Sequence, residues 1–289
     1  MLPNPLSPTP QFSRLTIPRR PLKIVRVTDY DQRFGGIARL YGDPALARLR
    51  EAHVCVIGLG GVGSWSVEAL ARSGLGRFTL VDLDEICVTN INRQIHALDA
   101  TVGQPKAEAL AHRIRIINPA ATVHPVQQFF TAATADQIFH QPFDYVIDGI
   151  DSVSNKCRLI ALCRHRHIPL ITCGAAGGRR DPTAIRITDL AHSSHDRLLA
   201  QVRKQLRTEH AFPRDPEPFG IACVFSPETP VAPEPTEAAC ANLPDPEPAD
   251  APLRRNCNSG LGSASFVTGA FGFAAAAHVV SQLARPQVP

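Results

Sequence analysis

Residues 54–92 read VCVIGLGGVGSWSVEALARSGLGRFTLVDLDEICVTNIN, and this stretch decides the fold of the chain. It opens with β-branched residues, which are typical of a strand buried in a parallel sheet. Gly58, Gly60, Gly61 and Gly63 follow at once, and a helical pattern of apolar residues comes next. Glycines allow a tight turn, and a helix start points unpaired amides at an anion. We therefore expect a nucleotide-binding turn; a glycine turn that serves only packing is the alternative.

A second apolar strand ends at Asp82, an acid that follows the last glycine of the turn by about 20 residues, as in the dinucleotide fingerprint. A carboxylate at this place accepts hydrogen bonds from a ribose. The pattern alone does not separate NAD from ATP. We expect the next two acids, Asp84 and Glu85, to be solvated loop charges.

The choice of nucleotide depends on Asn90, Asn92, Arg93 and Lys106. An NAD oxidoreductase leaves two cations near its second strand unexplained, because nicotinamide needs an apolar pocket. Attack on an α-phosphate instead builds negative charge that fixed cations and amides stabilise. Pro105 before Lys106 places the ammonium at the positive end of a helix. We therefore predict ATP and nucleotidyl transfer; a helix-start lysine on the surface is the alternative for Lys106.

Two acids, Asp148 and Asp151, follow a further apolar strand. In an open α/β sheet the carboxyl ends of the strands line the ligand crevice. Mg²⁺ binds through one or two carboxylates plus substrate phosphates. We predict Asp151 as the metal ligand and Asp148 as a nucleotide-binding residue, which leaves a helix or loop hydrogen-bond acceptor as the alternative for Asp148.

Taken together, these motifs resemble the adenylation domains of the ubiquitin-activating enzyme superfamily. The resemblance covers residues 30–225 and 256–285, and it is carried by GLGGVG at 58–63, Asp82, TNINR at 89–93, Lys106 and Asp151. It implies a Rossmann-like fold with ATP as the bound nucleotide and the phosphate groups as the place of reaction.

Within the superfamily, the chain is most similar to the bacterial tRNA threonylcarbamoyladenosine dehydratases. The segments that carry this similarity lie at 33–42, 92–98, 146–153, 173–191 and 222–228. The resemblance implies that ATP adenylates the carboxylate of threonylcarbamoyladenosine beside the tRNA anticodon. The activated carboxyl group then cyclises with loss of AMP, which amounts to a dehydration.

The resemblance also implies a homodimer in which an N-terminal arginine reaches the partner's ATP site. Arg33 lies at the matching place, ahead of the glycine turn. A surface arginine is the alternative.

The cysteines bear on a competing function, activation of a ubiquitin-like or sulfur-carrier protein. Eight cysteines occur without a CxxC pair, so a four-cysteine zinc site has no visible ligand set. We expect Cys257, which lies near the reactive cysteine of thioester-forming relatives, to be non-catalytic because the substrate can cyclise by itself. A cysteine desulfurase system is a partner by analogy only. Scattered cysteines and no signal peptide favour the cytoplasm.

Strand and helix patterns alternate along the chain, which predicts an α/β fold with a doubly wound, mostly parallel sheet. We expect a flexible basic arm over 1–30, an ATP-binding adenylation domain over 31–226, a Pro-rich crossover over 227–256 and a C-terminal helix packed on the domain over 257–285. At 289 residues and 44% hydrophobic content, the chain can bury one sizeable core.

Two segments keep two interpretations each. Residues 259–284 contain one ionisable group, His278, and are long enough to span a bilayer, but a core or interface helix is favoured over a membrane anchor. Arg179 and Arg180 follow two glycines, and further basic residues recur on a predicted helix beyond His195: Arg197, Arg203, Lys204 and Arg207. They either track tRNA phosphates or form an ordinary solvated helix face. The net charge of +4 is modest for a nucleic-acid-binding protein.

Overall fold

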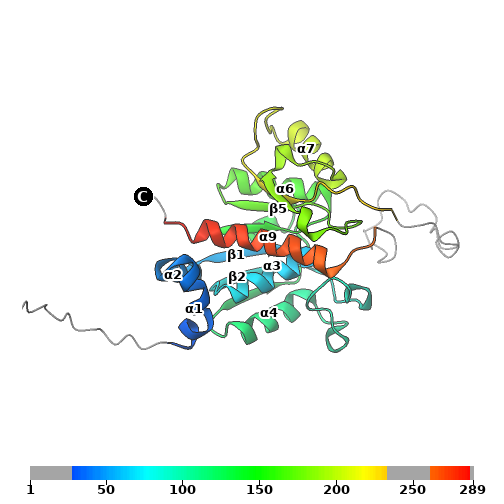
Figure 1. The fold of residues 1–289 in the computed structure, drawn as a ribbon. Coiled ribbons are helices and arrows are strands. Elements are labelled where there is room, and N and C mark those ends of the chain that lie inside the picture. Colours follow the sequence, from blue (N-terminus) through cyan, green and yellow to red (C-terminus); the bar gives the residue numbers. More distant parts are fainter. Residues whose placement is uncertain (1–27, 233–260, 287–289) are drawn as a thin grey trace, which may run out of the picture.

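The computed structural model describes residues 28–232 and 261–286 as one α/β fold (Figure 1). Its α-helices are α1 (Asp29–Tyr41), α2 (Asp43–Glu51), α3 (Gly61–Arg72), α4 (Lys106–Ile117), α5 (Ala135–Ile138), α6 (Val153–His165), α7 (Arg197–Glu209) and α9 (Ser265–Leu283). Its strands are β1 (His53–Ile57), β2 (Arg77–Val81), β3 (Thr122–Val126), β4 (Tyr145–Asp148), β5 (Leu170–Cys173), β6 (Arg186–Asp189) and β7 (Ala222–Phe225). Short 3₁₀ helices are η1 (Val88–Asn90), η2 (Asp99–Thr101), η3 (Pro182–Ala184) and η4 (Leu190–His192).

The seven strands form one sheet in the order β3-β2-β1-β4-β5-β7-β6. All neighbouring pairs are parallel except β6 and β7, which are antiparallel at the edge. The chain winds outward from β1 in both directions, so the order reverses between β1 and β4. The predicted doubly wound, mostly parallel sheet is confirmed, and its switch point lies where such folds bind ligands.

Helices cover both faces of the sheet, which explains why β1 is buried along its whole length. Val54 and Val56 pack into a core with α3, α4 and α9. Cys55 and Ile57 point the other way, into a core with α6 and α7. Because successive side chains of a strand face opposite sides, a strand in this position reads as a continuous apolar run.

The C-terminal helix α9 runs alongside α3 (Figure 1). Gly272 makes this close approach feasible, because a Cβ there would lie 2.6 Å from the Val62 carbonyl oxygen. Ser66 of α3 donates to the Gly272 carbonyl at 3.1 Å. Judged by its length and composition alone, the helix could cross a membrane. Half of an apolar 18-residue stretch of it, however, is buried within the protein. Its packing on the domain agrees with the core helix that we expect.

The segment boundaries differ in detail from the expected ones. Helix α1 begins at Asp29 with Thr28 as its cap, so residues 29 and 30 are helical and do not belong to an arm. The Thr28 side chain accepts from the Asp31 amide, and Asp31 accepts in return, which stabilises the first turn. Residues 1–27 and most of the Pro-rich segment, 233–260, lie outside the described residues.

Candidate functional site

The glycine turn joins β1 to α3 at the carboxyl edge of the sheet. Gly58 has φ +85°, and a Cβ on it would lie 2.7 Å from the Gly149 carbonyl oxygen. A Cβ on Gly63 would lie 1.9 Å from the Gly58 carbonyl oxygen. These two glycines are therefore required by the backbone itself. Their role is to let the turn pass close to the loop that follows β4.

Gly60 forms the open part of this turn, whereas a Cβ on Gly61 would lie 3.0 Å from the Thr268 side chain of α9. Among the described residues, a Cβ on Gly60 would meet only the Gln94 side chain, at 3.8 Å. No described side chain caps the start of α3, and its first turn carries no acid. The first amides of the helix thus lack partners within the helix, and the helix dipole favours an anion in front of them. This helix start is compatible with the predicted phosphate cradle, which stays a prediction.

Asp82 lies just after β2 and ties the cradle to that strand. Its Oδ2 accepts from the Leu59 amide at 2.7 Å, and its Oδ1 accepts from the Asp84 amide at 2.9 Å. Burial raises the pKa of Asp82, although the nearby Lys106 ammonium acts to lower it. A carboxylate has about four lone-pair sites, so two remain for ribose hydroxyls. Asp82 therefore serves the loop and remains able to bind a sugar.

Lys106 lies at the first position of α4, but it is not a surface charge. Its side chain is only 7% exposed, and its Nζ contacts Asp84 Oδ2 at 2.7 Å. Asp84 is 52% exposed, as expected of a solvated loop acid, but it is paired with Lys106, which the sequence did not predict. The reason is a pairing of two loops: the Lys106 amide donates to the Asp84 carbonyl at 3.0 Å, and Glu85 forms a β-bridge with Pro105. This contact brings the α4 start to the end of β2.

Asn90, Asn92 and Arg93 belong to a loop held beside the cradle. The buried Asn90 accepts from the Cys87 amide at 3.1 Å and so shapes η1. The Arg93 guanidinium donates to the Thr89 carbonyl at 2.7 Å and to the Asn92 side chain at 3.0 Å. A Cβ on Gly61 would lie 3.6 Å from Arg93 Cδ, so this arginine crosses next to the cradle.

Side chains of helices α3 and α9 hold this loop in place through hydrogen bonds. The Arg93 carbonyl accepts from Trp65 Nε1 of α3 at 3.0 Å and from Thr268 Oγ1 of α9 at 3.1 Å. Asn92 donates to the Ser263 carbonyl at 2.8 Å. The sequence pattern did not indicate that α9 takes part in the site. A threonine in a helix otherwise rich in alanine, glycine and phenylalanine is the signal that could have revealed it.

Asp148 lies in a different environment from the one expected. It is fully buried and pairs with Lys156 Nζ at 2.8 Å, an ion pair with both side chains 0% exposed. Thr172 donates to the same carboxylate at 2.7 Å, and the Ile150 amide donates to its other oxygen at 3.0 Å. These contacts support the alternative of a loop hydrogen-bond acceptor and do not support direct nucleotide binding. Asp151, two residues beyond Gly149, is exposed at the carboxyl edge.

Lys156 and Thr172 are site-supporting residues that sequence reasoning missed. Lys156 lies on the buried face of α6, next to Cys157 and one turn before Ile160. A lysine is almost never fully buried unless it is paired. A lysine within the apolar stripe of a helix that follows a strand-terminal aspartate could have been recognised as its partner.

Arg33 lies far from the cradle of its own chain. It pairs with Asp29 at 2.7 Å and donates to the Ile117 carbonyl, at the end of α4. Lys106 lies at the other end of this helix, whose 12 residues span about 18 Å. Arg33 therefore does not join the cradle residues within one chain, and a role in the partner's site stays a prediction.

Cys223 is one of the cysteines that the structure describes. Cys223 is buried on β7, and burial raises the pKa of its thiol well above the ordinary value. Over residues 28–232 and 261–286, no three histidine, cysteine or acidic side chains gather in a way that could hold a metal ion. Cys257 lies outside the described residues.

Known proteins share the fold and much of the sequence. The tRNA threonylcarbamoyladenosine dehydratase of Haemophilus influenzae is 45% identical over 263 residues, which are 91% of this chain and 97% of that protein. The crystal structure of the Escherichia coli tRNA N6-threonylcarbamoyladenosine dehydratase in complex with ATP matches with a TM-score of 0.77 and 44% identity, over 90% of this chain and 97% of that chain.

A more distant relative is similar over less than half of this chain. The molybdopterin-synthase adenylyltransferase of Salmonella typhimurium is 39% identical, but over 128 residues, which are 44% of this chain. The sequence model of a protein family described as "ThiF family" matches residues 35–288, from within α1 to beyond the end of α9. This range contains the glycine cradle, Asp82, Arg93 and Lys106, and the chain belongs to the ThiF family.

Proposed function

We propose that the protein is an ATP-dependent enzyme that dehydrates N6-threonylcarbamoyladenosine next to the anticodon of tRNA, through an adenylated carboxylate. The observation that carries this proposal is the convergence of the open glycine cradle, Asp82, Arg93 and Lys106 at one edge of the sheet. Similarity over nearly the full length to proteins named tRNA threonylcarbamoyladenosine dehydratase supports the substrate.

The first step joins the substrate to AMP. A carboxylate oxygen of the threonylcarbamoyl group attacks the α-phosphorus of ATP, and the bond to pyrophosphate breaks. The amides at the start of α3 hold phosphate oxygens, and Asp82 holds the ribose. Arg93 and Lys106 stabilise the charge that builds on the α-phosphate and on the departing pyrophosphate. To do so, Lys106 shares its ammonium between Asp84 and the nucleotide, because an ammonium has three donors.

The second step closes a ring. A nitrogen of the same threonylcarbamoyl group attacks the activated carbonyl carbon, gives up its proton, and AMP leaves with the former carboxylate oxygen. The attacking and attacked atoms belong to one molecule, so proximity replaces a covalent enzyme intermediate. This step needs no reactive cysteine. The buried, high-pKa thiol of Cys223 agrees with such a mechanism, because only a thiolate is a good nucleophile.

Asp151 is the residue that we assign to Mg²⁺. It is exposed at the carboxyl edge, whereas the neighbouring Asp148 is buried on Lys156. One carboxylate plus substrate phosphates is an ordinary set of ligands for this ion. When bound, Mg²⁺ would neutralise the charge of the phosphates.

The test of the activity is mass spectrometry of nucleosides from tRNA that carries threonylcarbamoyladenosine. Incubation with the full chain, ATP and Mg²⁺ should remove one water from that nucleoside and release AMP and pyrophosphate. The matched control replaces ATP by its α,β-methylene analogue, which fills the site but cannot lose pyrophosphate. An unchanged nucleoside, together with adenylation of a carrier-protein C-terminus, would establish the competing adenylyltransferase function instead.

The test of the site uses single substitutions. We expect Lys106→Ala and Arg93→Ala each to lower kcat by about 10²–10³, the usual loss on removal of one group that stabilises transition-state charge. Arg115→Ala removes an exposed arginine of α4 and is the control. Near-normal rates in both site variants would show that the assignment is wrong.

We also propose that the protein is a homodimer in which Arg33 completes the partner's site. Its distance from its own cradle is the supporting observation. In an equal mixture of Arg33→Ala and Lys106→Ala chains, roughly half of the dimers are mixed, and each mixed dimer should contain one intact site. The mixture should therefore show roughly a quarter of the wild-type activity. Failure of the two inactive variants to complement each other would contradict the exchange.

The scattered cysteines support a location in the cytoplasm, and the resemblance supports a protein partner. We propose a cytoplasmic protein that a cysteine desulfurase system contacts, with α9 inside the fold and not in a membrane. Alkaline carbonate extraction tests the location, because a chain anchored by α9 would stay in the membrane pellet. Co-purification with a desulfurase, compared with a chain of unrelated fold, tests the partner.

A further inference from the structure

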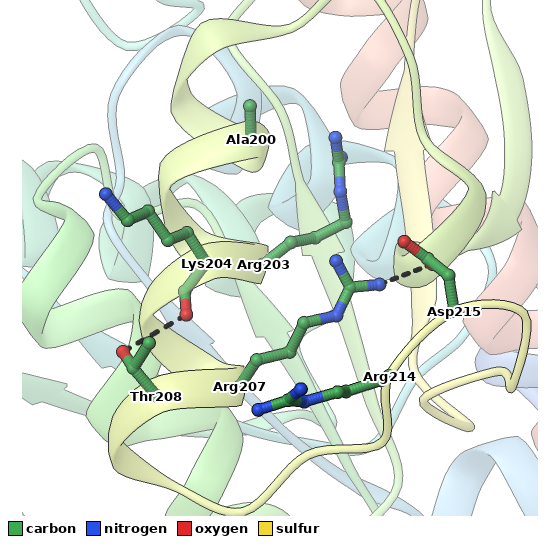
Figure 2. Close-up of a pocket in the computed structure, with 7 residues that line it drawn as sticks. All are labelled: Ala200, Arg203, Lys204, Arg207, Thr208, Arg214 and Asp215. Atoms are coloured by element: carbon green, nitrogen blue, oxygen red, sulfur yellow. Dashed lines mark hydrogen bonds and ion pairs between the residues drawn. The ribbon is translucent and has the colours of Figure 1, made fainter.

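A cluster of cations lies outside the nucleotide crevice, on α7 and the loop that follows it. An open depression of about 780 Å³ is lined there by Ala200, Arg203, Lys204, Arg207, Thr208, Arg214 and Asp215. Four of these seven side chains are cationic and one is acidic. Figure 2 shows the Arg207 side chain pointing from the helix toward Asp215, with Arg214 beside it, while Arg203 turns toward the top of the view and Lys204 extends to the left.

The protein only partly satisfies these charges. Arg207 pairs with Asp215 and donates to the Pro213 carbonyl at 3.2 Å. Within the described residues, no hydrogen bond or ion pair holds the exposed Lys204 ammonium or Arg214 guanidinium. The acid at the end of the same helix, Glu209, accepts from Gln205 and not from a cation. The depression therefore presents a surplus of positive charge to solvent.

The arrangement costs stability, which argues against a neutral helix face. Arg203 and Arg207 are four residues apart on α7, and like charges at this spacing destabilise a helix. Arg203 is half-buried and donates to Ser193. Burial, and then the charge of Arg207, lower the pKa of Arg203 below its ordinary value. An anionic ligand would relieve this repulsion.

The surface continues past the end of α7. A second depression, of about 360 Å³, is lined by Ala161, Arg164, His165, His167, His210, Ala211 and Phe212. Phe212 precedes Pro213 and Arg214 in the chain, so the two depressions are neighbours. The Arg164 guanidinium lies over the Phe212 ring, 4.2 Å from its centre. The hollowed polar surface thus extends beyond the four cations of the first depression and adds one further cation, Arg164.

The start of α7 links this surface to the crevice. Asp196, the helix cap, accepts from the Leu199 amide at 3.0 Å and from the Ala175 amide at 2.8 Å, just after β5. Helix α7 thus begins at the carboxyl edge of the sheet, the edge that carries the cradle. It then runs about 20 Å along the face covered by α6. A polymer with one residue in the crevice would reach the basic surface through its adjoining backbone.

We propose that this α7 surface, Arg203, Lys204, Arg207 and Arg214, binds the sugar–phosphate backbone of the tRNA whose modified adenosine enters the crevice. The inference rests on the proposed function. Backbone phosphates are the ligand that fits, because they repeat along an extended surface and are recognised by arginine and lysine without base readout. Arg179, a basic residue of the same sequence region, does not contribute: it is buried and contacts the Ala175 and His195 carbonyls.

The experiment measures binding of an unmodified, fluorescently labelled tRNA transcript by anisotropy, with KCl varied between about 50 and about 200 mM. Arg214→Ala should weaken binding several-fold and reduce the slope of log affinity against log salt by about one. Lys204→Ala/Arg214→Ala should weaken binding on the order of tenfold and reduce that slope by about two. Both side chains are exposed, so the fold should be retained.

The matched control is Arg115→Ala, which removes an exposed arginine from α4 on the opposite face of the sheet. It should leave both affinity and slope unchanged. The inference is overturned if the α7 variants bind the transcript as Arg115→Ala does. Inorganic phosphate at millimolar concentration should not compete at constant ionic strength; full competition would assign the depression to a small anion and also overturn it.

Turnover separates this inference from the proposed function. With substrate tRNA, the α7 variants should show a raised KM and an unchanged kcat, because their substitutions lie away from the reacting atoms. If wild type converts the nucleoside and the variants keep its KM, only the α7 surface is refuted. If wild type converts nothing but binds the transcript through these residues, only the proposed reaction is refuted.

Discussion

The ends of β2 and β4 carry the same sequence signal but do different work. Each strand is apolar and runs into an aspartate, Asp82 or Asp148, at the carboxyl edge of the sheet. Within residues 28–232 and 261–286, Asp82 accepts hydrogen bonds only from backbone amides, and it lies beside the cradle. Asp148 is fully buried against Lys156 and Thr172. The partner beneath the carboxylate, and not its place at the strand end, decides whether it is offered to a ligand.

The largest effect that we expect comes from removing the buried ion pair at the end of β4. Lys156→Met leaves the Asp148 carboxylate buried without its cation, which should lower the free energy of unfolding by about 3–5 kcal/mol. Urea denaturation of the purified chain measures the loss. Lys204→Met, at an exposed position of α7, is the matched control and should change little.

A second variant distinguishes the ion pair from simple loss of packing. Asp148→Asn/Lys156→Met keeps an acceptor for the Ile150 amide and removes both charges. It should recover much of the lost stability, because a neutral pair avoids the cost of an unpaired buried charge. If the double variant were as unstable as Lys156→Met alone, the charge of Asp148 would not be the cause.

At the end of β2, a substitution should change ligand binding and not stability. Asp82→Ala removes the ribose acceptor and should weaken ATP binding about tenfold to a hundredfold, the range for loss of charged hydrogen bonds of about 1.5–3 kcal/mol. Calorimetric titration with ATP and with 2′,3′-dideoxy-ATP gives the specific readout. Wild type should bind ATP more tightly than 2′,3′-dideoxy-ATP, whereas Asp82→Ala should bind the two nucleotides with equal affinity. A preference that survives in the variant would remove Asp82 from the ribose site.

The contrast also shows what a sequence can predict in this chain. Strand, glycine turn and helix are local, so the cradle at 58–63 and the sheet class follow from residues close together in the chain. The job of Asp148 depends on Lys156 in α6 and Thr172 in β5, which only the folded sheet brings together. The Asp84–Lys106 contact and the position of Arg214 beside α7 could not be predicted for the same reason. Both depend on the paths of loops, which carry no periodic signal in the sequence.

The loop beside the cradle gives a pH-dependent comparison. Burial, with the charges of Lys106 and Arg113, lowers the pKa of His96 from its ordinary 6.5 to about 3. Neither ring nitrogen has a hydrogen-bond partner among the described residues. The folded protein therefore keeps His96 neutral, whereas the unfolded chain takes up a proton below pH 6.5. The stability from this site is present above that pH and falls by roughly 1.4 kcal/mol per pH unit down to about 3.

Replacing this histidine should flatten the acid limb of the stability curve. His96→Leu should lose less unfolding free energy than wild type between pH 6.5 and about 3, as measured by urea denaturation at each pH. The exposed His112→Leu on α4 is the control and should follow wild type. Parallel curves for wild type and His96→Leu would mean that the ring titrates in the folded protein as it does in the unfolded chain.

The smallest effect on stability should come from Asp84, whose carboxylate is 52% exposed and faces Lys106. An ion pair with one half-exposed partner contributes about 0–1 kcal/mol, so Asp84→Asn should barely change the unfolding midpoint. Its effect on turnover separates two roles for Lys106. If Asp84 only aims the ammonium, Asn keeps an oxygen acceptor and kcat changes little, while Asp84→Ala lowers kcat with ATP affinity retained. If Asp84→Asn and Asp84→Ala lowered kcat equally, the negative charge itself would be needed at the end of β2, in contrast to β4, where the charge serves the fold.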